Sequence, residues 1–138
     1  MRRIPGANVL IVDDDEYNRK LLNIFISTEG HKPIEAASAQ EAVQRAEADH
    51  PDIILLDLMM PGVDGFELAR QLKGNPRTAD IPLVVVSALD DPAVAQRAIS
   101  CGVDGFVQKP LDRWQLLQTV NGLLTVDTGA TPGTDADA

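Results

Sequence analysis

The sequence has few residues that could form a covalent cross-link or bind a soft metal. It contains one cysteine, Cys101, and two histidines among 138 residues. A single cysteine excludes an internal disulfide and agrees with a reducing compartment, and we expect Cys101 to be a small buried hydrophobic residue. His31 and His50 stand far apart beside turn-like residues, and neither has a partner at metal-ligand spacing. We therefore predict that both histidines lie at the surface.

Positive charge and long apolar runs are also scarce. Lys and Arg number 12 against 21 Asp and Glu, which gives a net charge of −9. A nucleic-acid surface needs a basic patch, so this balance argues against one. No apolar run approaches the roughly 20 residues that span a bilayer, and the start MRRIPGANVLIVDDD contains no signal-peptide core. We expect a cytoplasmic protein that contacts neither nucleic acid nor membrane.

Short apolar runs alternate with longer amphipathic ones through most of the chain. The short runs are rich in Val, Ile and Leu, which is typical of strands buried on both faces. The longer runs repeat apolar residues at helical spacing, and Asp15, Ser38 and Asp64 stand where they would cap helices. The pattern predicts strands over 8–13, 33–37, 52–57, 81–87 and 103–109, and helices over 16–30, 38–50, 64–74, 91–102 and 112–124. This alternation indicates a doubly wound α/β domain with a parallel five-stranded sheet.

The end of the chain has a different composition. Residues 126–138 read VDTGATPGTDADA, which is small, polar and without periodicity. Such a segment cannot bury enough apolar surface to offset the entropy of ordering it. We predict one domain over residues 1–125, followed by a disordered tail or a linker over 126–138.

Charged and polar side chains stand where four of the predicted strands end. Asp13 ends the first strand and Asp14 follows it, Asp57 ends the third, Ser87 ends the fourth and Lys109 ends the fifth. Because the carboxyl ends of parallel strands meet at one edge of a sheet, we expect these side chains to converge. Clustered carboxylates raise one another's pKa unless a cation neutralises them. Oxygen ligands without Cys or His favour a hard cation, most simply Mg²⁺.

A phosphate fits the remaining chemistry of this edge. Mg²⁺ usually takes one or two carboxylates together with a phosphate oxygen. Lys109 can neutralise a second phosphate oxygen, and Ser87 can donate a hydrogen bond to a third. Asp57 is then the natural nucleophile, and its attack on phosphorus would form an acyl phosphate.

These residues stand in motifs that resemble the receiver domain of bacterial two-component response regulators. The resemblance covers about residues 7–124. It is carried by LIVDDDEYNR (10–19), DIILLDLMMPGVDGFEL (52–68), IPLVVVSA (81–88) and CGVDGFVQKPL (101–111). It implies a flavodoxin-like (βα)5 three-layer sandwich with strand order 2-1-3-4-5.

The resemblance also implies a role for each residue at the edge. Asp57 would accept the phosphoryl group, and Lys109 and Ser87 would contact it. Mg²⁺ would be held by Asp13, Asp14, Asp57 and the backbone carbonyl of Met59. The protein would then be a regulatory phosphoacceptor that catalyses only its own phosphorylation and dephosphorylation, and not an enzyme with turnover.

The resemblance further implies a switch and its partners. In the family, Ser87 moves toward the phosphate and the aromatic residue at Phe106 turns inward, which changes the face formed by the fourth helix, fifth strand and fifth helix. The phosphodonor would be a histidine kinase or a histidine phosphotransfer protein. A downstream output protein or a homodimer would use the switched face. Trp114 on the fifth helix either contacts a partner or packs against the fourth strand or helix.

Two other classes of protein stay open on the residues alone. An Asp-nucleophile phosphatase or phosphotransferase of the haloacid dehalogenase type would use a similar sheet, but it needs a second Asp two residues after the nucleophile. Met59 occupies that position, which argues against this class. A receiver-like scaffold that is never phosphorylated would not need the full set of acids, Ser87 and Lys109.

Overall fold

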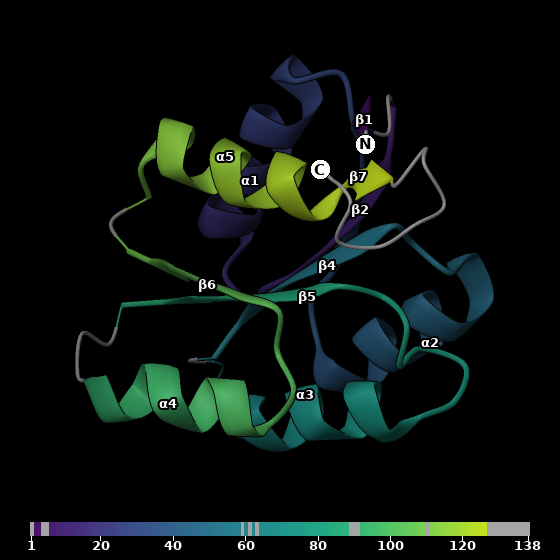
Figure 1. Ribbon diagram of the computed structural model, residues 1–138, viewed down its shortest axis with the longest axis vertical. Coiled ribbons are helices and arrows are strands. Elements are labelled where there is room, and N and C mark those ends of the chain that lie inside the picture. The colour runs from purple at the N-terminus through teal and green to yellow at the C-terminus, as the bar shows by residue number, and fades with distance from the viewer. Residues whose placement is uncertain are drawn as a thin grey trace.

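Five parallel strands form the central sheet of the computed structural model, which describes residues 2–3, 6–58, 60, 62, 64–88, 92–109 and 111–126 (Figure 1). The strands stand in the order β3-β2-β4-β5-β6. Numbered within this sheet alone, that order is 2-1-3-4-5, which confirms the expected topology. The alternating elements are β2 (Asn8–Val12), α1 (Glu16–Thr28), β3 (Lys32–Ala36), α2 (Ala39–Asp49), β4 (Ile53–Asp57), α3 (Gly65–Gly74), β5 (Leu83–Ser87), α4 (Pro92–Ser100), β6 (Gly105–Gln108) and α5 (Arg113–Leu123).

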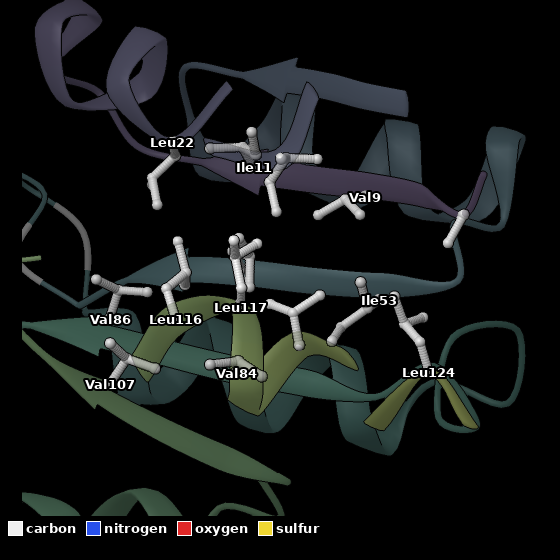
Figure 2. Close-up of a cluster of buried hydrophobic side chains, with 14 residues drawn as sticks. Val9, Ile11, Leu22, Ile53, Val84, Val86, Val107, Leu116, Leu117 and Leu124 are labelled. Carbon is white, nitrogen blue, oxygen red and sulfur yellow. The ribbon is translucent and has the colours of Figure 1, made fainter. Parts of the chain in front are cut away.

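Helices cover both faces of the sheet, so the central strands are buried on each side. Helices α1 and α5 lie on one face, and α2, α3 and α4 lie on the other (Figure 1). Alternate residues along a strand point to opposite faces, so Ile53 and Leu55 pack toward α1 and α5 while Ile54 and Leu56 pack toward α2 and α3. Figure 2 shows the first of these cores, with Leu22 of α1 and Leu116 of α5 against the strands. Among the described residues, no helix is both long and apolar enough to cross a bilayer.

The predicted helix caps are confirmed. The side chain of Asp15 accepts a hydrogen bond from the amide of Tyr17, and that of Asp64 accepts from the amides at the start of α3. Ser38 accepts from the amide of Glu41 at 3.1 Å. These bonds satisfy amides that have no partner inside the helix, so they fix where α1, α2 and α3 begin.

The sequence pattern missed a second, two-stranded sheet. Strands β1 (Arg2–Arg3) and β7 (Thr125–Val126) pair antiparallel, with Arg2 opposite Val126 and Arg3 opposite Thr125. Each strand is too short to show a period. Val126 was predicted to begin the tail, and its backbone instead belongs to this ribbon, whereas residues 127–138 lie outside the described residues.

The prediction that both histidines lie at the surface is wrong for His31. Only 6% of His31 is exposed, and its ring is hydrogen-bonded at both nitrogens. Nδ1 accepts from the amide of Ala7 at 3.1 Å, and Nε2 lies 3.0 Å from Oδ1 of Asn121. The ring therefore joins the start of β2 to the end of α5. His50 is exposed as predicted and lies 3.2 Å from Asp80, and Cys101 is buried as predicted.

Gly65 allows α3 to pack closely against the chain that follows β4. A Cβ atom at Gly65 would lie 2.7 Å from the Cα and 2.8 Å from the carbonyl oxygen of Leu58. Because these are backbone atoms, they cannot move aside cheaply. We expect Gly65→Ala to lower the free energy of unfolding by roughly 1–3 kcal/mol, as measured by urea denaturation.

Gly122 offers the matched control within α5. A Cβ atom there would meet nothing within 4 Å. Gly122→Ala is expected to raise stability by up to about 1 kcal/mol, because alanine loses less backbone entropy than glycine on helix formation. Equal stability of Gly65→Ala and the wild type would contradict the close approach of α3 to Leu58.

Candidate functional site

The predicted site residues that the structure describes gather at the carboxyl edge of the sheet. Asp57 is the last residue of β4, Ser87 is the last of β5, and Asp13 directly follows β2. Oxygen atoms of Asp13, Asp14 and Asp57 all lie within 4.8 Å of one another. Asp13 and Asp57 are buried, whereas Asp14 is exposed. The topology therefore brings Asp57 to the adjacent pair Asp13 and Asp14, which lie more than 40 positions earlier in the sequence.

Lys109 places one positive charge against this cluster. Its Nζ lies 3.6 Å from Oδ2 of Asp57 and 3.9 Å from Oδ2 of Asp13. The side chain of Lys109 is 18% exposed, so solvent screens these interactions only in part. The amide of Lys109 donates to the carbonyl of Ser87 at 2.7 Å, which ties the end of β6 to the end of β5. One ammonium cannot balance three carboxylates, and the cluster keeps a negative excess.

The Asp13 carboxylate is buried but only partly hydrogen-bonded. Its Oδ1 accepts from the amide of Asp15 at 2.9 Å, while its Oδ2 is buried without a hydrogen-bond partner among the described residues. Burial raises the pKa of Asp13 to about 6, and the charge of Asp57 adds to the increase against the lowering effects of the Asp15 amide and Lys109. A buried carboxylate oxygen without a donor fits a cation ligand. The donor set contains oxygen alone, which suits Mg²⁺.

Arg19 and Glu35 belong to the surroundings of the site and were not anticipated from the sequence. Nη1 of Arg19 donates to the backbone carbonyl of Asp13 at 2.9 Å, and its Nε donates to Oε1 of Glu35 at 2.9 Å. Arg19 reads as one of many polar residues on an amphipathic helix. The only signal at Glu35 was that it is a carboxylate inside the predicted strand over 33–37.

Three further predicted residues have different outcomes. Met59 lies outside the described residues, so its carbonyl remains a predicted ligand. Phe106 on β6 is half-buried and packs against a cluster that includes Val85 and Ala98. Trp114 is 82% exposed. It lines a groove of about 400 Å³ between α5 and the end of α1, which is contrary to the alternative of packing on the fourth strand or helix.

The chain is similar in sequence and in structure to known response regulators. Residues 9–121 match the family model of the response regulator receiver domain. The chain is 40% identical to response regulator PleD of Caulobacter vibrioides over 86% of its length, and it spans about a quarter (26%) of that relative. It is 32% identical to protein PilH of Pseudomonas aeruginosa, of which it covers 98%. The structure of the chemotaxis protein CheY4 of Vibrio cholerae superposes with a TM-score of 0.80 at 27% identity, covering 86% of this chain and 98% of CheY4.

Proposed function

Because the chain belongs to the response regulator receiver domain family, whose members are phosphoacceptors of two-component signalling, we propose that Asp57 is its phosphoacceptor. One observation carries the assignment. Asp57 is the only carboxylate of the cluster that ends a central strand, and it faces both Lys109 and the acids Asp13 and Asp14. The strand holds it at the carboxyl edge of the sheet, where 6% of its side chain is exposed.

The residues of the site divide the chemistry of phosphoryl transfer. A carboxylate oxygen of Asp57 attacks the phosphorus of a phosphohistidine, the phosphorus–nitrogen bond breaks, and the imidazole leaves with its electron pair and takes up a proton. Lys109 neutralises the charge that gathers on the phosphoryl oxygens, and Ser87 donates a hydrogen bond to one of them. Asp13, Asp14 and Asp57 would hold Mg²⁺, with the Met59 carbonyl as a further ligand. The bound ion would supply positive charge to the phosphoryl oxygens.

Phosphorylation would act as a switch on one face of the molecule. The phosphoryl group adds about two negative charges at neutral pH. Drawing Ser87 toward it leaves space near Phe106, whose half-buried ring packs beside α4. We infer that this shifts a two-state equilibrium of the α4–β6–α5 face, where Ile99 is 67% exposed. An output protein or a second copy of the chain would bind there.

The family is regulatory, and its members take phosphate from histidine kinases or phosphotransfer proteins. We propose such a donor for this chain, no turnover of small phosphate esters, a cytoplasmic location, and contact with neither nucleic acid nor membrane. Residues 126–138 would serve as a tail or a linker, with Val126 held in the ribbon by Arg2.

Intact-protein mass spectrometry after incubation with acetyl phosphate tests the proposed function. We expect a single phosphoryl adduct that forms with Mg²⁺, is absent with EDTA, and maps to the peptide that contains Asp57. Incubation with p-nitrophenyl phosphate is the control for the phosphatase class, and we expect no continuing release of nitrophenol. An adduct on any other residue, or sustained turnover, would overturn the proposal.

A further inference from the structure

The carbonyl of Asp13 lies at the point where the chain leaves the sheet. Val12 is the last paired residue of β2, opposite Ala36 of β3. The amide of Asp13 still donates to the carbonyl of Ala36, at 3.1 Å, but its own carbonyl lies beyond the ladder. That carbonyl needs another donor, because an unpaired backbone oxygen is costly when it is removed from water. Nη1 of Arg19 supplies this donor at 2.9 Å.

The peptide group that contains this carbonyl links the two acids of the proposed metal site. It joins Asp13 to Asp14, so its orientation sets the directions in which both side chains leave the backbone. The Asp13 and Asp57 carboxylates repel each other, and this repulsion works to push the loop outward. A guanidinium held at two points resists such movement better than a water molecule would, since its donors form a planar fork of fixed geometry.

Glu35 provides the second point of attachment. Its Oε1 accepts from Nε of Arg19 at 2.9 Å, and its Oε2 accepts from Asn23 at 2.7 Å and from Lys20 at 3.2 Å. The side chains of Arg19 and Glu35 are 14% and 20% exposed. Although burial raises the pKa of Glu35, hydrogen bonds from Arg19, Asn23 and Lys20 hold it below its usual value. Glu35 is therefore ionised at neutral pH and orients the guanidinium.

We propose that Arg19, oriented by Glu35, is a positioning residue that fixes the Asp13–Asp14 peptide so that both carboxylates face Asp57. The proposal rests on the proposed function of the site. Arg19 does not touch the reacting atoms, and it acts through the backbone carbonyl of Asp13. Glu35 offsets part of the guanidinium charge, and the proposed effect is on the geometry of the Asp13–Asp14 peptide. Partners that orient metal ligands typically change metal affinity by about 10- to 100-fold when they are removed.

Binding of Mn²⁺ to the unphosphorylated protein, followed by electron paramagnetic resonance of the free ion, tests the proposal. We expect Arg19→Ala and Glu35→Gln each to weaken Mn²⁺ binding by about tenfold or more. Arg19→Lys should recover only part of the affinity, because an ammonium lacks the planar fork. Amide resonances of Asp14 and Asp15 should shift in Arg19→Ala before any metal is added.

Two controls separate positioning from charge and from general loosening of the fold. Lys20→Gln removes a positive charge from the same helix and a bond to Glu35 but leaves the Asp13 carbonyl untouched, so its Mn²⁺ affinity should stay within about twofold of wild type. Thr78→Val removes a buried 2.6 Å hydrogen bond to the carbonyl of Leu72. It should lower the melting temperature without changing Mn²⁺ affinity.

The outcomes distinguish this inference from the proposed function. If the wild type binds Mn²⁺ and is phosphorylated, but folded Arg19→Ala and Glu35→Gln bind the ion as tightly as Lys20→Gln does, the positioning role is overturned and the function stands. If Arg19→Ala does not fold, Glu35→Gln and Arg19→Lys decide the matter. A wild type that neither binds Mn²⁺ nor accepts phosphate overturns both.

Discussion

Replacing Asp57 by asparagine is expected to abolish the phosphoryl adduct. The side-chain amide is a poor nucleophile at neutral pH, and the substitution also removes one of the three carboxylates whose oxygen atoms lie within 4.8 Å of one another. The fold should survive, because asparagine is nearly isosteric with aspartate. Intact mass after incubation with acetyl phosphate and Mg²⁺ should show only the unmodified protein.

Asp64→Asn is the matched control for this loss. Asp64 is an exposed carboxylate near the same edge that caps α3, and asparagine caps helices about as well as aspartate does. This variant should be phosphorylated as fully as the wild type. Residual adduct on Asp57→Asn at the wild-type level would place the phosphoryl group elsewhere and remove the basis of the proposed switch.

Asp57→Asn should also melt at a higher temperature than the wild type when Mg²⁺ is absent. The charge of Asp57 contributes to the raised pKa of Asp13, which means that the two ionised carboxylates oppose each other in the folded state. Removing one of them relieves that repulsion. A functional residue that destabilises its own fold is expected where a site is kept ready for a cation.

Mg²⁺ should stabilise the protein much more at neutral pH than in mild acid. Asp13 has a pKa of about 6 in the folded state against 3.8 as its ordinary value, so the folded protein binds this proton more tightly than the unfolded chain does. As pH rises from 3.8 to about 6, the contribution of Asp13 to the free energy of unfolding falls, by an amount on the order of 3 kcal/mol. Because metal ligands must be deprotonated, we expect Mg²⁺ to offset this penalty only where Asp13 has lost its proton.

Urea denaturation from about pH 4 to about pH 7, with and without Mg²⁺, measures this linkage. Glu35, whose pKa is lowered from its ordinary value of 4.5, contributes with the opposite sign, because its stabilising effect is present above that ordinary value and is lost as pH falls through its folded-state pKa. The contribution of Asp13 is therefore obtained by subtracting the pH dependence of the free energy of unfolding of Asp13→Asn from that of the wild type. If the free energies of unfolding of wild type and Asp13→Asn change in parallel across this range, the pKa of Asp13 is not raised in the folded state.

The parallel sheet and the meeting of the acids could be predicted from local patterns, whereas the strand order was implied by the resemblance to the receiver family. The run Ile53–Leu56 marks a strand with two buried faces, and parallel topology then carries Asp57 to the same edge as Asp13 and Lys109. The predicted ends of the helices and strands were less accurate. The last strand was predicted over 103–109 and spans Gly105–Gln108, since strand ends depend on pairing with β5.

Features that depend on long-range hydrogen bonds were not predicted. His31 is buried because the amide of Ala7 and the side chain of Asn121 complete its bonding, and these partners lie 24 and 90 positions away. The hydrogen bonds of Arg19 at the site could not be predicted for the same reason. A helical pattern assigns it to a polar face, but only the fold brings the carbonyl of Asp13 and the carboxylate of Glu35 to its guanidinium.

The small β1–β7 ribbon has a mechanical consequence. Arg2 faces Val126 and Arg3 faces Thr125, so a force that pulls Arg2 and Val126 apart loads one pair at a time. This peeling geometry yields at low force, unlike a shear geometry in which all pairs bear the load together. The ribbon lies beside the start of β2, away from the edge that carries Asp57 (Figure 1). Tension at the two ends would therefore unzip the ribbon before it reached the sheet that holds the acids.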